Sequence, residues 1–387
     1  MLSWTKLKPQ DIKALVKRTK NSCMTRARNK SKAAVLIKWL FGVNLFFLVL
    51  LLLTYVTPYI RVESWGWLSL LALAYPFVLL TNGVFAAVWL VWRKWYAALS
   101  LVAILAGMTY HMRYIKLFSL RGLHASCEES IRLMSYNVRG LSLVPGGKNS
   151  GIQAKIDSLY KALNDLHEFP DILCLQEATS GDLIAKRFGM KHSLHAPKSS
   201  LWLLSRFPIL KHGELKGAEE SPSCMWADLK TPQGILRVYN MHLVSNRVTN
   251  TTEELIQDMD LKNENTWHNI RFIFKRYKQT TILRAREAQA LRDHFANSPY
   301  PAVIAGDGND TPLSHTYYVL SSGLNDSFLD RGYGLSTTYN STLPLLRIDY
   351  LLGNASVAFK DHTTHHLRYS DHYPVSTGIC LNSGSGS

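Results

Sequence analysis

Two long runs without a charged side chain dominate the first third of the chain. Residues 39–60 and 64–92 contain 22 and 29 uncharged residues. Each run exceeds the roughly 20 residues that an α-helix needs to cross a bilayer. Residues 95–112 form a third apolar stretch, close to the lower limit of that length. We therefore predict a transmembrane region over residues 39–112, with three helices at these positions.

Two other structures contain apolar runs of this kind. A helix in the core of a soluble protein rarely continues this far without a charge. A cleaved signal peptide is short, whereas here a basic arm of residues 1–38 precedes the first run and further runs follow. Trp and Tyr at the ends of the runs suit the membrane interface. Membrane spans are the favoured interpretation.

The positive charge of the chain is concentrated near its start. Of the net charge of +16, residues 1–38 contribute +10, from 11 Lys/Arg and one Asp, and residues 39–123 contribute +5. The remainder has 27 Lys/Arg and 26 Asp/Glu, a net +1. A strongly basic chain suggests a nucleic-acid partner, but a nearly neutral C-terminal part does not. The arm is instead expected to set topology and to contact anionic lipid headgroups.

Lys and Arg beside the apolar runs predict their orientation, because such residues favour the cytoplasmic side. The arm lies in the cytoplasm, the turn with Arg61 outside, and Arg93–Lys94 inside, so three spans place the C-terminal part outside the cytoplasm. The expected protein is a multi-pass cell-membrane protein, periplasmic in its main domain if bacterial. Basic residues after the third run oppose this topology, and a two-span hairpin with a cytoplasmic domain is the alternative. Five cysteines without a CxxC pair do not decide between them.

Residues 130–381 read as one α/β domain, after a connector at 113–129 and before a flexible tail at 382–387. Apolar runs typical of strands alternate with turn signals. Two segments have the spacing of helices, residues 151–168 and residues 281–296. The expected strands are residues 131–138, 171–177, 201–210, 234–244, 302–307, 347–353 and 373–381.

Polar side chains recur at the ends of these expected strands. Each has an ordinary structural explanation by itself, such as a capping Asn, a turn Asp or a satisfied core His. A whole set at successive strand ends indicates a site, because a buried charge is costly unless it is paired or metal-bound. The residues are Asn137, Glu177, His242, Asp307, Asn309, Asp349, Asp371 and His372.

These residue types can support hydrolysis of a phosphate ester. A hard divalent cation prefers oxygen ligands, which Glu177 supplies with Asp371 or Asn137. An attacking water needs a residue that orients it, for which Asp307 is suited. Asn309 and His242 are candidate donors to phosphoryl oxygens.

The remaining two residues have the form of a pair. His372 with Asp349 as its carboxylate partner would make an oriented, charge-stabilised imidazole. With the metal ligands and donors, this pair completes the set of groups expected at a hydrolytic site.

The motifs SYNVRG, DILCLQE, LLSRFPI, YNMHLVS, AGDGND, RIDYLL and SDHYPV occur in this order between residues 130 and 380. In this the chain resembles the endonuclease/exonuclease/phosphatase superfamily, which includes DNase I-like nucleases, AP endonucleases, neutral sphingomyelinases and inositol polyphosphate 5-phosphatases. The resemblance implies a four-layer α/β sandwich of two packed mixed β-sheets flanked by helices. It also implies a site at one end of the sandwich, with Mg²⁺ or Mn²⁺ as cofactor.

By position, the resemblance implies a role for each residue. Glu177 matches the main metal ligand, Asp371 the second metal-associated Asp, and Asn137 the Asn of the first strand. The other matches are His242 as the phosphate contact, Asp307 with Asn309 as the pair that orients water and phosphate, Asp349 as the carboxylate partner of the catalytic His, and His372 as that His.

Gly308 departs from the family pattern, which has a large apolar residue there. The missing side chain is expected to leave a cavity or a looser strand end. No ligand is lost, so the expected effect is lower rigidity. The departure keeps open a second class of function, a membrane-tethered binding scaffold with a degenerate site.

The sequence favours a lipid headgroup as the phosphodiester substrate, because the domain is nearly neutral and is predicted to be tethered to a bilayer. A membrane-tethered nuclease acting on DNA or RNA is the alternative, and a soluble phosphomonoester is a third. No protein partner is implied. Residues 265–279 mix aromatic and basic side chains and are the expected specificity element. That composition fits a helix at a membrane interface, a phosphate-contacting surface with aromatic stacking, or an ordinary amphipathic helix packed on the sandwich.

Overall fold

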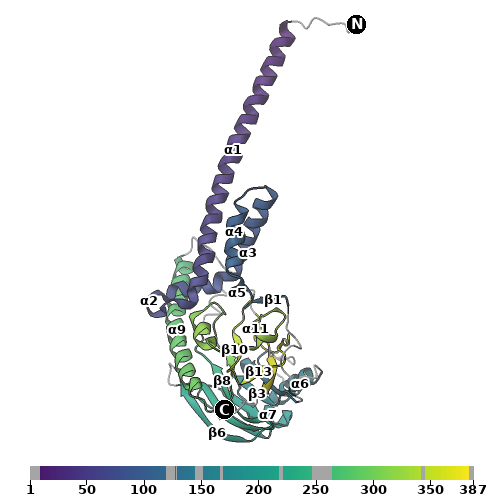
Figure 1. The fold of residues 1–387 in the computed structure, drawn as a ribbon, viewed down its shortest axis with the longest axis vertical. Helices are drawn as coiled ribbons and strands as arrows, with labels where there is room; N and C mark the ends of the chain where they lie inside the picture. Colours follow the sequence, from purple (N-terminus) through teal and green to yellow (C-terminus); the bar gives the residue numbers. More distant parts are fainter. Residues whose placement is uncertain are drawn as a thin grey trace. The chain divides into compact units, whose positions relative to one another are not determined.

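The computed structural model describes residues 9–118, 127, 129–143, 151–165, 169–217, 221–245, 264–340 and 345–382. It divides into two compact units. We call Met1–Leu52 with Phe77–Leu105 the helical unit, and Leu53–Pro76 with Ala106–Ser387 the sheet unit. Figure 1 shows the elements of both units in chain order.

The helical unit consists of long apolar helices. Two helical segments, Ser31–Tyr59 and Val62–Val91, are long and apolar enough to cross a membrane, by length and composition. Buried polar side chains join the helices: Asn44 donates to the Ser100 hydroxyl (2.9 Å) and accepts from the Trp89 indole N–H (2.9 Å). The helices are α1 (Pro9–Val56), α3 (Ser69–Val91) and α4 (Ala97–Ala106), of which residues 53–56, 69–76 and 106 belong to the sheet unit.

The third apolar stretch is not one continuous helix. The expected helix over residues 95–112 is divided at Gly107 into α4 and a short α5 (Met108–His111). A Cβ at Gly107 would lie 2.2 Å from the Tyr55 hydroxyl oxygen, so this close approach requires glycine. Ten residues of α4 extend about 15 Å, half the thickness of a bilayer core.

Two mixed β-sheets form the sheet unit, as expected. The six-stranded sheet has the order β10-β12-β9-β8-β7-β6, and the seven-stranded sheet has the order β13-β15-β2-β3-β5-β4 with β14 beside β15. Within the first, β8 and β9 are parallel; within the second, β2 and β3 are parallel. The other pairs in both sheets are antiparallel.

The strands of the six-stranded sheet are β6 (Ile209–Lys216), β7 (Pro222–Thr231), β8 (Gly234–His242), β9 (Ala302–Asp307), β10 (Asn325–Asp326) and β12 (Asp349–Gly353). Those of the seven-stranded sheet are β2 (Ile131–Asn137), β3 (Ile172–Gln176), β4 (His192–Ala196), β5 (Leu201–Ser205), β13 (Val357–Phe359), β14 (Thr363–Thr364) and β15 (Val375–Leu381).

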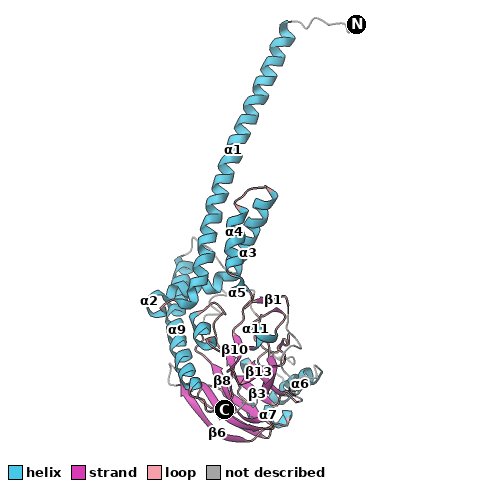
Figure 2. Cartoon of the chain, viewed as in Figure 1, coloured by secondary structure: helices cyan, strands magenta, loops and turns pink. Residues whose placement is uncertain are grey.

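Helices cover the outer face of each sheet, which gives four layers (Figure 2). Alternation along the strands creates this arrangement, because successive side chains point to opposite faces. On β2, Leu133 packs between the sheets, whereas Met134 packs against the helical side. The covering helices are α6 (Ile152–Asp165) and α7 (Gly181–Phe188) on one side, and α9 (Glu264–Ala296) and α10 (His315–Ser321) on the other.

Several expected elements have different bounds. The expected strand 201–210 is two strands in different sheets, β5 and β6, because the chain crosses between the sheets near Pro208. Five strands of the two sheets were not expected from the sequence: β4, β7, β10, β13 and β14. The helix expected over residues 281–296 begins at Glu264 and therefore includes the aromatic and basic segment.

The sheet unit also includes chain that was expected to belong to the membrane region or the connector. Its turn contains η1 (Thr57–Tyr59), α2 (Val62–Trp65) and η2 (Gly66–Leu68). The Thr57 hydroxyl donates to the Leu313 carbonyl (2.8 Å), and the His315 ring lies 2.9 Å from the Pro58 carbonyl oxygen. In the expected connector, β1 (Ile115–Lys116) pairs with β11 (Gly334–Leu335).

Cys127 and Cys380 form a disulfide, with their Cα atoms 5.9 Å apart. It links the chain just before β2 to β15. Cys174 and Cys224 are free and buried, and Cys174 lies in the core as the sequence suggested.

Two buried histidines make the sheet unit sensitive to acid. Burial lowers the pKa of His362 to about 3 and that of His365 to about 4. In the unfolded chain both pKa values lie near 6.5. Between these pKa values the unfolded state binds more protons than the folded state. The contribution of the two histidines to the free energy of unfolding is therefore fully present above about pH 6.5 and is lost as the pH decreases.

We therefore predict that His362→Gln reduces the acid sensitivity of folding. The wild-type free energy of unfolding should fall by about 2 kcal/mol per histidine between pH 8 and pH 5. His362→Gln should be less stable at pH 8, because it loses the contact with Ser327 (2.8 Å), but should lose less stability on acidification. Melting temperatures at the two pH values measure both effects. An unchanged pH dependence in the variant would contradict the prediction.

Candidate active site

The ends of parallel strands bring the predicted residues to one end of the sandwich. Asn137 ends β2 and pairs in register with Gln176, the last residue of β3, so Glu177 follows directly. His242 ends β8 opposite Asp307, which ends β9. Asp349 begins the antiparallel β12, also opposite Asp307. Both sheets therefore contribute to the site.

Asn137 connects the two sheets through its amide. Its Nδ2 donates to Glu177 Oε1 (3.2 Å) and to Asp307 Oδ2 (3.1 Å). Its Oδ1 accepts from the backbone N–H of Arg139 (3.1 Å). Two carboxylates from different sheets thus converge on one amide nitrogen.

His242 lies beside the same two carboxylates. Its Nε2 is 3.6 Å from Glu177 Oε1 and 3.8 Å from Asp307 Oδ2. This nitrogen is buried and makes no hydrogen bond within the part of the chain that the structure describes. The position predicted to contact phosphate therefore holds a donor or acceptor without a hydrogen-bond partner.

Asn309 holds Asp307 in place. Its backbone N–H donates to Asp307 Oδ1 (2.8 Å), and its Nδ2 donates to Asp307 Oδ2 (3.2 Å) and to the Leu243 carbonyl (2.9 Å). Both amide protons are thus engaged, so Asn309 can contact phosphate only by releasing one of them. Asn309 and Glu177 both have φ of 52°, a left-handed conformation that is costly for such residues and is concentrated at functional sites.

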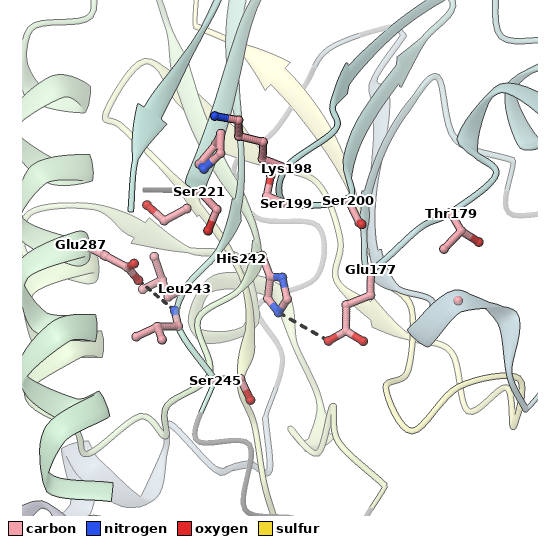
Figure 3. A pocket seen from close by; sticks show the side chains of 14 residues that line it. Glu177, Thr179, Lys198, Ser199, Ser200, Ser221, His242, Leu243, Ser245 and Glu287 are labelled. Atoms are coloured by element: carbon pink, nitrogen blue, oxygen red, sulfur yellow. Dashed lines mark hydrogen bonds and ion pairs between the residues drawn. The ribbon is translucent and has the colours of Figure 1, made fainter. Parts of the chain in front are cut away.

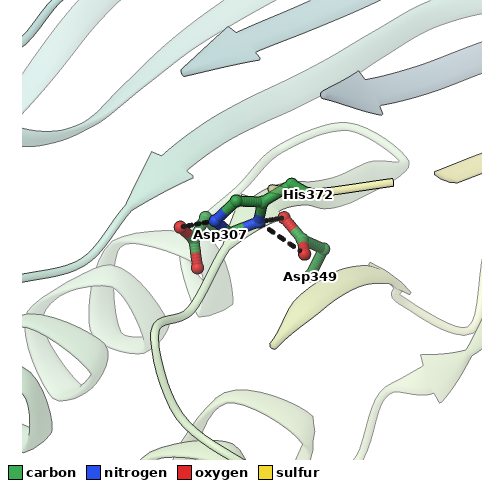
Figure 4. Close-up of side chains that lie close together, drawn as sticks. All are labelled: Asp307, Asp349 and His372. Atoms are coloured by element: carbon green, nitrogen blue, oxygen red, sulfur yellow. Dashed lines mark hydrogen bonds and ion pairs between the residues drawn. The ribbon is translucent and has the colours of Figure 1, made fainter. Parts of the chain in front are cut away.

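His372 lies between two carboxylates (Figure 4). Its Nδ1 is 3.0 Å from Asp349 Oδ2, and its Nε2 is 3.6 Å from Asp307 Oδ2. Burial lowers the pKa of His372, but Asp349 and Asp307 outweigh it and raise the pKa to about 10. Burial also raises the pKa of Asp349. The chain of three groups therefore holds a proton on the imidazole at neutral pH.

One ligand atom from each of Asp307, Asp349 and His372 lies within 4.8 Å of the others. Such a group can hold a metal in principle. His372 Nδ1 is held by Asp349 (3.0 Å), an arrangement that occurs both in an oriented acid or base and in a metal-bound histidine. The raised pKa of His372 favours the acid or base.

Asp371 makes its own set of contacts, apart from those of Asp307, Asp349 and His372. Its Oδ2 is 2.8 Å from Arg139 Nη1 and accepts from the Tyr339 hydroxyl (3.4 Å), and its Oδ1 accepts from the Ser370 hydroxyl (3.1 Å). The structure therefore gives it basic and hydroxyl partners, and its assignment as a metal ligand stays a prediction.

Three residues that support the site were not predicted. Arg139 pairs with Asp371, and the Tyr339 ring lies edge-on to His372, with centroids 4.9 Å apart. The buried Arg284 contacts Asp310 (3.1 Å) and donates to the Val244 carbonyl (3.0 Å), so it ties the chain after β9 to the chain after β8. Its signal was an Arg within the segment of residues 281–296, which has the spacing of an amphipathic helix.

A pocket of about 600 Å³ opens beside Glu177 and His242 (Figure 3). Hydroxyl groups line much of it, and Lys198 contributes a positive charge. Glu287 on its wall accepts from the backbone N–H of Val244 (2.8 Å). The hydroxyl-bearing residues are Thr179, Ser199, Ser200, Ser221, Ser223 and Ser245.

The expected cavity at Gly308 is absent, because the Tyr350 ring fills the space. A Cβ at Gly308 would lie 3.1 and 3.2 Å from two carbons of this ring, and 3.4 Å from the Ile348 carbonyl oxygen. The ring is fixed, since its hydroxyl donates to the carbonyls of Asp310 (2.7 Å) and Arg347 (2.9 Å). The site is therefore packed around glycine.

We predict that Gly308→Phe lowers the melting temperature. Overpacking a filled core costs about 1–3 kcal/mol, and the Tyr350 ring can move only by breaking its hydrogen bonds. Gly308→Ala should have a smaller effect of the same sign. Thermal unfolding followed by circular dichroism measures the difference. An increase in the melting temperature of Gly308→Phe would mean that a cavity exists after all.

Two family profiles match the chain. The endonuclease/exonuclease/phosphatase family profile matches residues 134–372, which include all of the predicted site residues. The chain belongs to this family. A second profile, described only as a domain of unknown function, matches residues 37–114. No curated protein matches the chain in sequence.

Several solved structures are similar to part of this chain. A family member from Bacteroides thetaiotaomicron is 17% identical over 65% of this chain and 97% of its own, with a TM-score of 0.47. A mannosyl-6-phosphatase of the same species is 17% identical over 65% of this chain and 100% of its own (TM-score 0.46). The human Nocturnin catalytic domain with bound sulfate is 15% identical over 66% of this chain and 96% of its own (TM-score 0.43).

Proposed function

We propose that the protein is a membrane-anchored, divalent-metal-dependent phosphoesterase that hydrolyses the phosphodiester of a lipid headgroup. The observation that carries the proposal is His242 Nε2, which is buried without a hydrogen bond beside the carboxylates of Glu177 and Asp307. A phosphoryl oxygen is a natural acceptor for this nitrogen.

The residues present fit a divalent cation. Glu177 and Asp307 share one amide donor, Asn137 Nδ2, which brings oxygens of two carboxylates to one place. Glu177 is 43% exposed in its side chain and lines the pocket, so its oxygens can be reached from solvent. Glu177 would hold Mg²⁺ or Mn²⁺, which would stabilise negative charge on the phosphoryl group. Asn137 would join it only through Oδ1, which already accepts from the Arg139 N–H.

The other residues position the reacting groups. Asp307, fixed by Asn137 and Asn309, orients the attacking water. His372, fixed by Asp349, supplies positive charge or a proton beside Asp307. His242 donates to a phosphoryl oxygen.

The pocket supports a polar headgroup as the leaving group. It opens at Glu177 and His242, and its serine and threonine hydroxyls suit a polar molecule with several hydrogen-bonding groups. Lys198 can pair with an additional negative charge. The nearly neutral charge of residues 124–387 gives no general attraction to a nucleic-acid backbone.

The helical unit supports membrane insertion with the N-terminus in the cytoplasm. The rings of Phe41 and Tyr96 are 4.4 Å apart, so the turn with Arg93–Lys94 lies beside the part of α1 that directly follows Lys38. The basic residues at the end of the arm and those of the turn therefore lie at the same end of the helix bundle. Basic residues at one end of a helix bundle favour the cytoplasmic side.

The sheet unit supports an extracytoplasmic location for the site. Its turn, residues 57–68, joins the two candidate spans and packs on the same unit as the active site through Thr57 and Pro58. We propose that the turn and the site share the extracytoplasmic side of the membrane. The disulfide Cys127–Cys380 agrees, since disulfides persist mainly outside the cytoplasm.

The experiment that tests the function uses the full chain in phospholipid and sphingolipid vesicles. The full chain is needed because residues 53–76 are part of the sheet unit. Headgroup release and nicking of plasmid DNA are measured in parallel with Mg²⁺, Mn²⁺ or chelator. We expect metal-dependent headgroup release, lost in Glu177→Gln, which keeps the size of the side chain but removes its charge. Metal-dependent nicking without headgroup release would identify a tethered nuclease instead.

A further inference from the structure

The first half of α9 carries an exposed stripe of alternating aromatic and basic side chains. Trp267, Arg271, Phe274 and Lys278 are spaced by three or four residues and therefore lie on one face of the helix. Trp267 is 49% and Phe274 52% exposed, and both basic residues are exposed. Tyr277, on the neighbouring face of the helix, is buried.

The stripe is not explained by packing within the sheet unit. An ordinary amphipathic helix places its aromatic side chains in the core and its charges in water, whereas here large aromatic side chains stand among exposed charges. Residues 265–279 contain four Lys/Arg and no Asp/Glu. Such a face is complementary to a negatively charged surface with an apolar layer beneath it.

The neighbours of α9 in the sheet unit indicate that this negatively charged surface is a membrane. The Tyr277 hydroxyl donates to the Ser69 carbonyl (3.3 Å), and the Lys278 side chain lies against Gly66 in η2. Helix α9 thus packs on η2 and on the first residue of α3, at the start of the second candidate span, Val62–Val91. The turn also exposes aromatic side chains: Tyr59 is 55%, Trp65 54% and Trp67 52% exposed. Tyr and Trp side chains are typical of the membrane interface.

We propose that the first half of α9 and the turn at residues 57–68 form one docking surface for an anionic lipid bilayer. The aromatic side chains enter the headgroup layer, and Arg271, Lys275 and Lys278 contact lipid phosphates. This surface holds the sheet unit against the membrane, so that headgroups rather than soluble esters reach the pocket. The inference rests on the proposed membrane anchoring, and it goes beyond anchoring because two spans alone do not fix the orientation of the unit.

The test measures the depth of a fluorescent probe at Phe274. The full chain carries Phe274→Cys, labelled with an environment-sensitive dye, in a Cys23→Ser background, since Cys174 and Cys224 are buried. It is reconstituted into phosphatidylcholine vesicles with roughly a quarter phosphatidylglycerol, with or without nitroxide-labelled lipid. We expect the emission of the dye at position 274 to shift to the blue when the vesicles are present, and to be quenched when they contain nitroxide-labelled lipid.

Two control positions separate this proposal from the proposed anchoring. Ala290→Cys is exposed on the same helix, about 24 Å further along its axis, and should not be quenched. Leu80→Cys, 68% exposed in α3, should be quenched if that helix is in the bilayer. Quenching at Leu80 without quenching at Phe274 would overturn the docking surface while leaving the anchor intact. Quenching at neither would overturn both.

Charge is tested with Arg271→Gln, Lys275→Gln and Lys278→Gln together. In the triple variant, the probe at position 274 should no longer be quenched, whereas the probe at position 80 should still be quenched. In the protein that keeps the three basic residues, the probe at position 274 should be quenched less in vesicles of pure phosphatidylcholine than in vesicles that contain phosphatidylglycerol. These readouts report location and do not depend on hydrolysis, so an inactive enzyme would still give them. A probe at Phe274 that responds to an added oligonucleotide and not to nitroxide lipid would identify the stripe as a nucleic-acid surface.

Discussion

His372→Asn is expected to lower the turnover number by roughly 10²- to 10⁴-fold, the range for loss of a general acid or base. The imidazole is the group whose Nε2 faces Asp307 (3.6 Å) while its Nδ1 is held by Asp349 (3.0 Å). Asparagine keeps a polar group near Asp349 but has no titratable nitrogen. The rate of metal-dependent phosphodiester hydrolysis by the reconstituted full chain measures the effect.

Asp349→Asn is the matched control for this assignment. If Asp349 acts only by orienting and charging His372, its replacement should also reduce the rate, and the double variant should be little worse than His372→Asn alone. Multiplicative losses would show that the two residues act separately. Circular dichroism of each variant checks that the buried site has kept its fold, and full activity in His372→Asn would remove the residue from the mechanism.

Arg347→Met is expected to cost about 3–5 kcal/mol of stability, the usual cost of leaving one charge of a buried ion pair alone. Arg347 is paired with Asp326, and the two side chains are 1% and 2% exposed. Burial raises the pKa of Asp326, but Arg347 and Tyr317 outweigh it and hold the pKa below its usual range. The guanidinium also lies 4.9 Å from the ring centroids of Phe328 and Tyr350.

The fall in melting temperature for Arg347→Met should be roughly 10 °C for a unit of this size. The control is Arg347→Met combined with Asp326→Asn, which leaves no unpaired charge and keeps an oxygen to accept from the Phe328 N–H (2.9 Å). The double variant should recover part of the loss. A double variant less stable than Arg347→Met would mean that the Asp326 carboxylate stabilises the fold by itself, through Tyr317 (2.7 Å).

Parts of the fold that depend on local pattern could be predicted from the sequence. The expected strands at β2, β3, β8, β9, β12 and β15 exist, because each is a short apolar run next to turn residues. The run 201–210 was misread as one strand, because nothing in its composition shows that Phe207 and Pro208 lie where the chain passes from one sheet to the other. The continuity of residues 265–279 with the helix expected over residues 281–296 was also missed, since exposed aromatic side chains disturb the helical pattern there.

The predicted site residues gather at one end of the sandwich, with Asp371 held in its own contacts with Arg139 and Tyr339. Their residue types and order were visible because chemistry restricts them. The supporting residues were not, because Arg139, Tyr339 and Arg284 have roles only through partners that are distant in the chain. Gly308 shows the same limit: the sequence revealed a missing side chain, but only the packing showed that Tyr350 replaces it.

The sequence by itself determined the class of fold, the apolar helices and the chemical groups at the strand ends, since these follow from local periodicity and residue type. Only the tertiary structure decided which carboxylates share Asn137, that Cys127 pairs with Cys380, and that the turn at residues 57–68 packs on the unit that contains the site. The reason is physical. Such contacts join residues far apart in the chain, and their energies depend on distances that no local pattern specifies.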